Sequence, residues 1–379
     1  MKILMVFSRF DPTEASLYSP MYFFCQKIAE MGHEVHVLTA SETEQQTKRL
    51  ARNLYVHYIK NPEARILTPP LYLTQITLIV LRNRIDVLYS HISSVQGLTV
   101  AFVGLLLRKP TFHWHCGFEA YFAVGKPLFQ RLRSYYVLAT VFKLAKTVIT
   151  CTNAAKQHYI KFFHVLPNKI EIMPNSVDMN LFNPEVSGKE VVYKHRLGGK
   201  RVILFVHHLS PRKGPEYMIK ALPYLIENGY RDVHCIMAGN GPQLKELEEL
   251  AKEIGVADNV TFTGALPNIE VPHYMAAAAV FVCPSVYEEF GRVIIEAMAS
   301  EKPIVATCTG GIPEVAPDGE VAILVPTKNP VAIAKAIERI LGDKNLAEEL
   351  STNAYRRAKR LYSTEQVARR FIEIVSKST

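Results

Sequence analysis

The feature that most constrains the fold is a regular alternation of short apolar runs with longer helical segments along the chain. In the first half of the chain, most of the apolar runs are separated by roughly 12 to 20 residues with the spacing of a helix. This is the pattern of alternating strands and helices in an α/β fold. Such alternation joins parallel strands by right-handed crossovers, which predicts a doubly wound sheet. The expected strands are Lys2–Phe7, Glu34–Thr39, Leu54–Ile59, Asp86–His91, Thr111–His115, Thr147–Thr150 and Ile170–Met173.

A second series of alternating elements follows a pause at residues 175–200, which are rich in turn dipeptides and typical of a connector. With 379 residues in the chain, two domains are expected. We predict an α/β fold of two Rossmann-like doubly wound domains facing a central cleft, where ligands bind at strand ends. The predicted parts are a first domain over 1–180, a linker over 181–200, a second domain over 201–360 and a helix over 361–379 that could cross back. The second series of strands is Val202–Val206, Val233–Ala238, Asn259–Thr263, Val280–Cys283, Ile304–Thr307 and Val321–Val325.

Composition excludes several classes of protein. The hydrophobic fraction of 49% supports packed cores and excludes general disorder. The longest apolar stretches, Leu71–Leu81 and Gly97–Leu107, are about half the length of a bilayer span. The segment Met1–Phe7 is strand-like and unlike a signal peptide. Six scattered cysteines without a C-x-x-C pair favour reduced thiols over a disulfide framework or a zinc site, so a cytoplasmic location is expected.

Positive charge is concentrated in the first half of the chain. Residues 1–190 carry 21 Lys and Arg against 13 Asp and Glu, whereas residues 191–379 carry 23 against 22. This imbalance favours an anionic partner, such as a phosphorylated acceptor or an acidic membrane surface at which the protein would be peripheral; solvation of the surface by lysines is the alternative. The segment Lys126–Lys146 interleaves basic and aromatic residues as membrane-surface helices do, although an internal helix with a basic outer face fits equally well. No nucleic-acid recognition motif accompanies the high pI.

The segment Pro284–Ala299 follows an expected strand and opens a helix, and it carries the strongest chemical signal. Unpaired N–H groups at a helix N-terminus form an anion site suited to a diphosphate. Glu296 lies about one turn inside this helix, where it could bond a ribose hydroxyl, and Glu288 could reach a sugar hydroxyl or the reacting centre. An acidic first turn that stabilises its own helix is the alternative. The expected N–H donors are those of Phe290, Gly291, Arg292 and Val293.

The spacing of Glu288 and Glu296 resembles the E-x7-E signature of the family 4 retaining glycosyltransferases (group 1), which have the GT-B fold. Phe205–Gly214 resembles the F-V-G-R-L-x-x-x-K-G motif of this family, and Ile172–Asp178 with Phe182 resembles its I-P-N-G-V-D…F motif. The resemblance is dense in the C-terminal half and loose in the N-terminal half. Three further segments match in order: Ala238–Pro242, Val260–Gly264 and Thr309–Glu314.

The resemblance implies metal-independent transfer of a sugar, with retained configuration, from a UDP-, GDP- or ADP-sugar to an acceptor. The acceptor would be a sugar, a phosphorylated molecule or a lipid-linked one, and no cofactor is expected. A GT-B-type sugar-nucleotide epimerase and a non-catalytic sugar-nucleotide-binding relative are the alternatives. A dinucleotide-binding oxidoreductase is disfavoured because Gly239-Asn240-Gly241 lacks the third glycine of the fingerprint.

The resemblance also assigns roles to single residues. Lys213 matches the lysine that stabilises the leaving diphosphate, while His208 replaces the arginine five positions earlier and Arg212 could compensate. His115 matches the histidine that contacts the donor sugar, with His113 second because the register could slip. The remaining donor-binding residues expected are Gly239, Gly241, Gly310 and Gly311.

The first loop, Ser8–Ser16, lacks the glycine pair that family members carry near the acceptor. Without glycine the backbone approaches a ligand less closely, so a different acceptor pocket is predicted. Arg9 or Asp11 could touch the acceptor, although a solvated turn is favoured.

Overall fold

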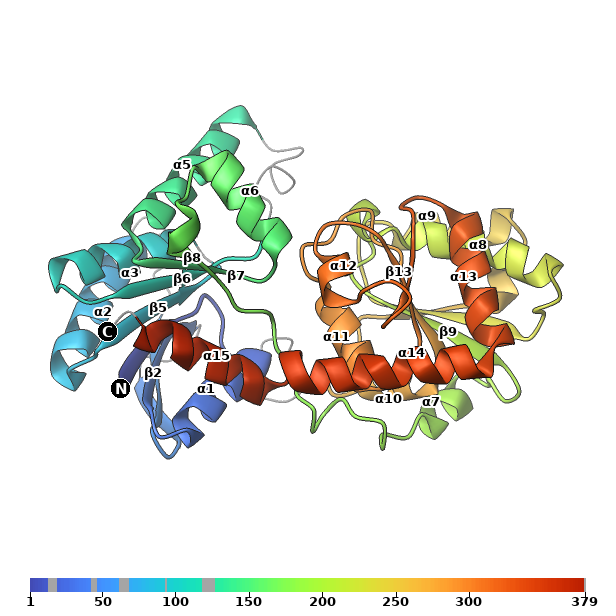
Figure 1. Ribbon diagram of the computed structural model, residues 1–379, viewed down its shortest axis with the longest axis horizontal. Coiled ribbons are helices and arrows are strands. Elements are labelled where there is room, and N and C mark those ends of the chain that lie inside the picture. Colours follow the sequence, from blue (N-terminus) through green and yellow to red (C-terminus); the bar gives the residue numbers. More distant parts are fainter. Residues whose placement is uncertain (13–18, 42–45, 61–67, 93, 118–126, 378–379) are drawn as a thin grey trace. The chain divides into compact units, whose positions relative to one another are not determined.

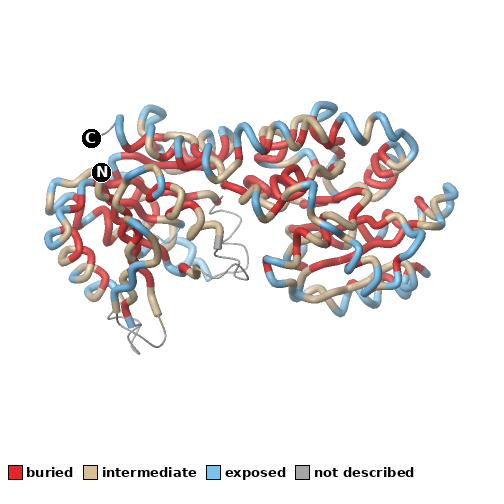
Figure 2. The backbone as a smooth tube through the Cα atoms, turned by 90° about the horizontal axis from the view of Figure 1, so that it is seen from below, coloured by how far each residue is buried: buried red, intermediate tan, exposed pale blue. Residues whose placement is uncertain are grey.

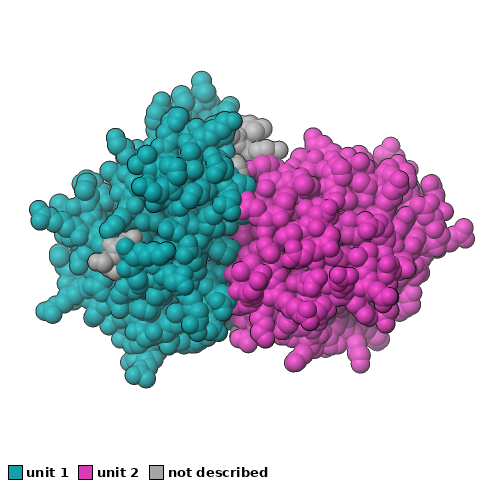
Figure 3. Space-filling model, viewed as in Figure 1, with its two compact units in different colours: residues 1–13, 18–174, 364–379 teal, residues 14–17, 175–363 magenta. Residues whose placement is uncertain are grey.

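The computed structural model describes residues 1–12, 19–41, 46–60, 68–92, 94–117 and 127–377 (Figure 1). They form two compact units, coloured separately in Figure 3. Unit 1 contains the described residues up to Pro174 together with those from Thr364 onward, and unit 2 contains Asn175–Ser363. Each unit is built around one largely parallel sheet, which confirms the expected α/β class. Residues 175–200, expected to form a connector, fold with unit 2, where helix α7 (Lys189–Lys194) packs on α10 (Val271–Ala277).

Unit 1 contains an eight-stranded sheet in the order β3-β4-β2-β1-β5-β6-β7-β8. All neighbouring strands are parallel except β3, which pairs antiparallel with β4 at one edge. The pattern did not predict β3, because its residues are mostly polar and half-exposed. The strands are β1 (Lys2–Val6), β2 (Glu34–Ser41), β3 (Gln46–Ala51), β4 (Leu54–Lys60), β5 (Val87–His91), β6 (Thr111–Trp114), β7 (Thr147–Thr150) and β8 (Ile170–Ile172).

Helices cover both faces of this sheet because right-handed crossovers place them according to strand order. One face carries α2 (Thr68–Asn83), α3 (Ser94–Leu106), α5 (Leu128–Leu144) and α6 (Asn153–Phe163), of which α2, α3 and α5 pack side by side. The crossover from β1 to β2 runs in the opposite direction and places α1 (Ser19–Glu30) on the other face. Figure 1 shows α5 and α6 adjacent, joined by the hydrogen bond from the Tyr135 hydroxyl to the Phe162 carbonyl.

Helix α15 (Thr364–Ser376) returns to unit 1 and packs on α1. Its apolar face inserts Phe371 against Phe24 and Tyr89, with ring centroids 5.6 and 5.2 Å away. At its side Arg370 pairs with Glu171 at 2.7 Å. The apolar face of residues 367–375 is therefore buried in unit 1, although these residues lie far along the chain from the rest of that unit.

Unit 2 contains a six-stranded, fully parallel sheet in the order β11-β10-β9-β12-β13-β14. Its core lies between this sheet and the packed helices α8, α9 and α13. The strands are β9 (Arg201–Val206), β10 (Val233–Ala238), β11 (Val260–Gly264), β12 (Ala278–Cys283), β13 (Ile304–Thr307) and β14 (Ile323–Val325). Besides α7 and α10, the helices are α8 (Pro215–Glu227), α9 (Leu244–Glu253), α11 (Arg292–Ala299), α12 (Ile312–Val315), α13 (Pro330–Gly342) and α14 (Lys344–Arg357).

Burial follows the layers. In Figure 2 buried red segments lie in the interior and exposed blue segments lie on the outside, and in the β1, β10 and β12 strands most residues are buried. In unit 2 the chain leaves β9 toward β10 and leaves β12 toward β13, in opposite directions, so the strand order reverses between β9 and β12. Ligands of open parallel sheets bind where this reversal occurs. No helix among the described residues is long and apolar enough to cross a bilayer.

Candidate functional site

The loops that follow β9 and β12 lie in direct contact at the carboxyl edge of the unit 2 sheet. The carbonyl of Arg212 accepts hydrogen bonds from the N–H groups of Val286 and Tyr287, at 2.9 and 3.3 Å. Gly214 closes the first loop in a left-handed conformation, and an added Cβ there would lie 2.3 Å from the Pro284 carbonyl oxygen. Glycine therefore allows the two loops to approach.

Lys213 and Glu288 form a buried ion pair between these loops. The Lys213 Nζ donates to Glu288 Oε2, and the two side chains are 4% and 8% exposed. Burial opposes ionisation of Glu288, but His207 and the Lys213 charge outweigh it and hold the pKa of this carboxyl well below its usual range. The site therefore presents an ammonium and a carboxylate in contact at neutral pH.

His207 is the third member of this cluster, and its role was not predicted. Its Nδ1 accepts the N–H of His208 at 2.9 Å, which leaves the proton on Nε2, 3.5 Å from Glu288 Oε2. Burial lowers the pKa of His207 to about 4, against the opposing effect of Glu288, so the ring is neutral at pH 7. A histidine where the family motif has glycine was the signal that could have found it.

Beside the pair, Arg212 makes a second ion pair. Its Nη1 donates to Glu289 Oε2 at 2.7 Å, and the Glu289 side chain is buried. His208, expected at the position of the family arginine, is exposed. Arg212, the candidate for compensation, therefore follows His208 along the loop next to Lys213 and is paired with Glu289, whereas the His208 side chain faces solvent.

Helix α11 begins directly after the loop that carries Glu288. Gly291 is its N-cap in a left-handed conformation, with a φ of +83°, and its carbonyl accepts the N–H of Ile294 at 2.9 Å. Inside the helix the buried Glu296 accepts from Arg292 Nε at 3.0 Å. Burial raises the pKa of Glu296, and Arg292 opposes the rise. The Phe290 side chain is buried against Tyr362, so only its backbone is available to a ligand, while Val293 is half-buried.

Glycines allow the neighbouring loops to approach the site. An added Cβ would lie 1.8 Å from the His207 carbonyl oxygen at Gly239 and 2.2 Å from the Leu209 carbonyl oxygen at Gly241. At Gly310, with a φ of +55°, it would lie 1.9 Å from the Glu288 carbonyl oxygen, which also accepts the N–H of Gly311 at 3.0 Å. The loops after β9, β10, β12 and β13 are thus packed backbone to backbone around Lys213 and Glu288.

His115 belongs to unit 1, where it follows β6 and is buried. Its Nδ1 lies 2.7 Å from the Tyr159 hydroxyl, which also lies 3.0 Å from the His115 carbonyl oxygen. His113 is buried on the same strand and bonds the Ser90 hydroxyl at 2.9 Å, and an added Cβ at Gly97 would touch its ring. His113 is thus a packed core residue, whereas the Tyr159 hydroxyl holds His115 at the strand end.

The expectation that all cysteines are reduced is wrong for two of them. Cys116 and Cys151 form a disulfide, with Cα atoms 5.8 Å apart. They follow β6 and β7, which are adjacent parallel strands, so residues 35 apart in sequence meet at one sheet edge. The disulfide lies directly after His115. Lys126 and residues 13–16 of the first loop, for which the sequence also raised expectations, lie outside the described part of the chain.

Two family models match consecutive parts of the chain. The model "Glycosyltransferase Family 4" matches residues 21–181, and "Glycosyl transferases group 1" matches residues 190–357. The first match lies in unit 1, apart from its last residues, and the second lies entirely in unit 2. The first and second halves of the chain therefore match two models of the same group of glycosyltransferases.

Individual proteins agree with the family models. An uncharacterised glycosyltransferase of Methanocaldococcus jannaschii is 31% identical over 60% of this chain and 59% of its own length. A component of the phosphatidylinositol N-acetylglucosaminyltransferase of Arabidopsis thaliana is 26% identical over 98% of this chain and 80% of its own length. The chain thus matches less than two thirds of the archaeal relative's length.

A solved structure extends the similarity to the fold. The Anabaena protein HepE in complex with UDP-glucose superimposes with a TM-score of 0.78, covering 100% of both chains at 21% identity. At this identity the match shows the fold alone, which is GT-B, with two Rossmann-like parallel-sheet units in one chain. On the two consecutive family matches and this fold, the chain belongs to the family 4, group 1 glycosyltransferases.

Proposed function

We propose that the chain is a retaining glycosyltransferase that moves a sugar from a nucleotide diphosphate sugar to an acceptor. The observation that carries the proposal is the buried Lys213–Glu288 pair beside the first turn of α11, at the reversal of strand order in unit 2. Such a pair sets a fixed cation and a fixed carboxylate in one small volume.

The donor diphosphate would be held by positive groups of unit 2. As the bond from sugar to phosphate breaks, negative charge grows on the diphosphate, and preorganised cations and N–H dipoles lower the barrier most. Lys213 would move its interaction from Glu288 to a diphosphate oxygen, with the N–H groups of Gly291 and Arg292 at the helix N-terminus beside it. Arg212 would add charge from the next position, held by Glu289.

The remaining groups would orient the nucleotide and the sugar. Glu296, buried one turn inside α11, would accept from the ribose, and the loop around Gly239 and Gly241 would border the base. Glu288, released by Lys213, would accept from a sugar hydroxyl and stabilise the positive charge that develops at the anomeric carbon. For His115 the family resemblance predicts contact with the donor sugar, and within unit 1 its ring is held by the Tyr159 hydroxyl.

The donor we favour is a UDP-sugar, because HepE was crystallised with UDP-glucose bound. Since the Arabidopsis relative is named for phosphatidylinositol, we also propose a lipid-linked or phosphorylated acceptor for this chain. The basic first half would then meet an acidic membrane surface. Reaction without a metal follows from the same charge set, since Lys213, Arg212 and the helix N-terminus would neutralise the diphosphate.

A donor panel tests the proposal. Purified protein would be incubated with UDP-, GDP- and ADP-sugars, with and without sugar or lipid acceptors, and the anomeric configuration of the products determined by NMR. Transfer with retention is expected. Lys213→Ala would lower the rate about 10²-fold or more, as loss of one charge-stabilising donor does. Lys245→Ala, at an exposed position of α9, is the matched control and would keep the rate.

Other products would contradict the proposal in identifiable ways. An epimerised sugar nucleotide formed without acceptor would identify an epimerase. Binding of a UDP-sugar in calorimetry with neither hydrolysis nor transfer would identify a non-catalytic relative. Equal rates for Lys213→Ala and the unmodified chain would overturn the assignment of the site.

A further inference from the structure

The net positive charge of the chain equals the net charge of one stretch of unit 1. Residues 87–170 contain ten Lys and Arg and one Asp or Glu, so this stretch accounts for the whole net charge of +9. Its one carboxylate, Glu119, lies outside the described residues, and the described residues of this stretch contain none. A surface made from these elements therefore carries an excess of positive charge and attracts anions.

Helix α3 contributes an outer side without charge. Its thirteen residues include no Asp, Glu, Lys or Arg. The side chains that it turns away from the sheet are large and apolar, and Leu105 is 66% exposed. Their spacing places them on one stripe of the helix, opposite the buried residues Val100 and Val103. The stripe consists of Val95, Phe102, Leu105 and Leu106.

Helix α5, which packs beside α3, combines apolar and basic residues on its outer side. Phe129 is 73% exposed, and Leu132 and Tyr136 continue the same stripe. Arg133 and Lys143 are exposed along that stripe, and no ion pair or hydrogen bond joins either side chain to another described residue. We call these outward residues of the two helices, with the α3 stripe, the α3–α5 face.

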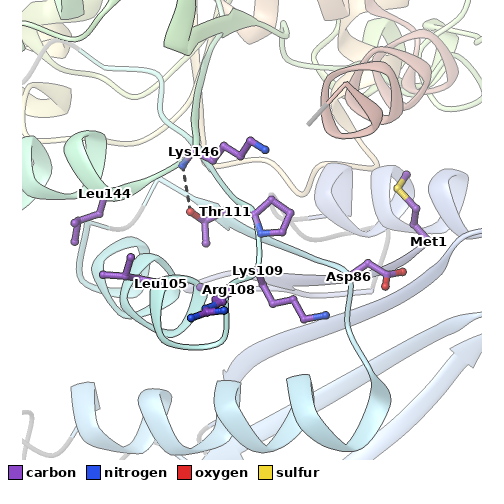
Figure 4. Close-up of a pocket in the computed structure, with 10 residues that line it drawn as sticks. Met1, Asp86, Leu105, Arg108, Lys109, Thr111, Leu144 and Lys146 are labelled. Atoms are coloured by element: carbon purple, nitrogen blue, oxygen red, sulfur yellow. Dashed lines mark hydrogen bonds between the residues drawn. The ribbon is translucent and has the colours of Figure 1, made fainter. Parts of the chain in front are cut away.

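A basic pocket lies where both helices end. It has a volume of about 610 Å³ and lies at the amino edge of the unit 1 strands, opposite the edge that carries His115. Figure 4 shows Leu105 and Leu144 on one side of Arg108 and Lys109, with Asp86 on the other side. Lys146 completes the basic lining.

The acidic side chain of the pocket is already engaged. Asp86 Oδ2 accepts the N–H of Lys2 at 2.8 Å. No described carboxylate forms an ion pair with Arg108 or Lys109. Within the described part of the chain the pocket therefore has a surplus of positive charge, next to exposed leucines.

We propose that the α3–α5 face binds the surface of a bilayer that contains acidic lipids, with the pocket receiving a phosphate-bearing headgroup. Arg108, Lys109 and Lys146 would contact the lipid phosphate, while the leucines and Phe129 enter the boundary between headgroups and acyl chains. Such a partner offers negative charge and hydrocarbon together, which the exposed residues require. The inference identifies the surface for the membrane contact of the proposed function, but it does not require catalysis.

Vesicle binding tests the inference. Vesicles of phosphatidylcholine alone, or mixed with phosphatidylglycerol, would be incubated with the full chain, and bound protein measured by flotation at low and high salt. Binding is expected to the mixed vesicles alone, weakening as salt screens the charges. Arg108→Gln/Lys109→Gln would bind about 30-fold more weakly, because each cation near an acidic surface contributes about fivefold.

Two further variants sharpen the result. Leu105→Gln/Leu106→Gln would weaken binding at low and high salt alike, since apolar contact is not screened. Lys245→Gln/Lys252→Gln removes the same charge from exposed positions of α9 in unit 2 and would bind as the unmodified chain does. Circular dichroism would verify that every variant is folded.

The inference is overturned if the unmodified chain does not bind mixed vesicles, if it binds neutral vesicles equally well, or if the α9 control loses binding to the same extent. Binding of single-stranded RNA in place of vesicles would also overturn it. Calorimetry of UDP-glucose with the same variants separates this inference from the proposed function. Loss of vesicle binding with UDP-glucose binding intact supports the docking surface, whatever the outcome of the transfer assay.

Discussion

Replacing Lys213 by methionine would leave the Glu288 carboxylate buried without its cation. The side chains of both residues are less than a tenth exposed, so water cannot replace the lost partner. Breaking a buried ion pair on one side costs about 3–5 kcal/mol in unfolding free energy. In the unmodified chain His207 adds no charge to the pair at pH 7, because burial lowers its pKa to about 4.

The double variant Lys213→Met/Glu288→Gln is the matched control. It removes both charges and keeps side chains of similar size, so the unfolding free energy would fall by about 1 kcal/mol or less. A single loss several times larger than the double loss is therefore expected. A larger loss of unfolding free energy in the single variant than in the double variant would show that the buried unpaired charge, and not the change in side-chain shape, destabilises unit 2.

The loss of unfolding free energy in Lys213→Met also depends on pH. In the unmodified chain the pKa of Glu288 lies below its ordinary 4.5, so the stabilisation by the pair is complete above about pH 4.5 and is lost as the pH falls through the folded value. In Lys213→Met the pKa of Glu288 would be higher than in the unmodified chain, because the Lys213 charge no longer opposes the effect of burial. Lowering the pH would then protonate the carboxyl and relieve the cost, so the difference between the two proteins would shrink from pH 7 to pH 4.

Hydrogen exchange followed by mass spectrometry would measure these differences. Peptides from β9 and β12 report the unfolding of unit 2 alone, which separates it from unit 1 in a chain of two units. Equal protection of these peptides in Lys213→Met and the unmodified chain would refute the buried pair. So would a double variant less stable than the single one.

Three more predictions concern other features. Cys151→Ser would lower the unfolding free energy of unit 1 by about 4 kcal/mol, because the disulfide joins residues 35 apart in sequence. Reductant would cause the same loss in the unmodified chain, and denaturant curves that stay unchanged would contradict the disulfide. Gly310→Ala would destabilise unit 2 more than Gly319→Ala does, and it would weaken UDP-glucose binding in calorimetry. Both glycines have a left-handed φ, but an added Cβ meets the Glu288 carbonyl oxygen only at Gly310. Equal effects of the two substitutions would contradict this close approach. EDTA would leave transfer unchanged, whereas loss restored by Mg²⁺ would contradict diphosphate neutralisation by protein cations.

Most of the sheet architecture could be predicted, because buried parallel strands are continuous apolar runs. Segments such as Val233–Ala238 lie inside the sheet with every residue buried, so composition alone marks them. The strand Gln46–Ala51 escaped prediction for the opposite reason. It forms the antiparallel edge, where polar, half-exposed side chains give no strong pattern.

The candidate site was predictable where a motif and a strand end coincide. Lys213 and Glu288 both follow strands of one sheet, and the structure brings them into contact. The neighbouring histidine was misjudged because the motif drew attention to His208, whereas the turn after β9 exposes that side chain and directs His207 to Glu288. The contact depends on the path of the loop, which spacing alone does not specify.

The disulfide could not be predicted from spacing. Cys116 and Cys151 meet only because β6 and β7 are neighbours and run in the same direction. The linear pattern predicts which segments are strands, but strand order comes from the packing of the whole sheet. Isolated cysteines therefore gave no sign of their partner.

The return of α15 to unit 1 has a consequence for biosynthesis. The aromatic contacts of Phe371 with Phe24 and Tyr89 join the earliest elements of the chain to residues translated more than 280 positions later. While the ribosome makes residues 175–363, the apolar surface of α1 that will receive α15 has no cover. The described residues of unit 2 form one stretch that is complete before α15 is made, so unit 1 can finish its packing only after unit 2 has been translated.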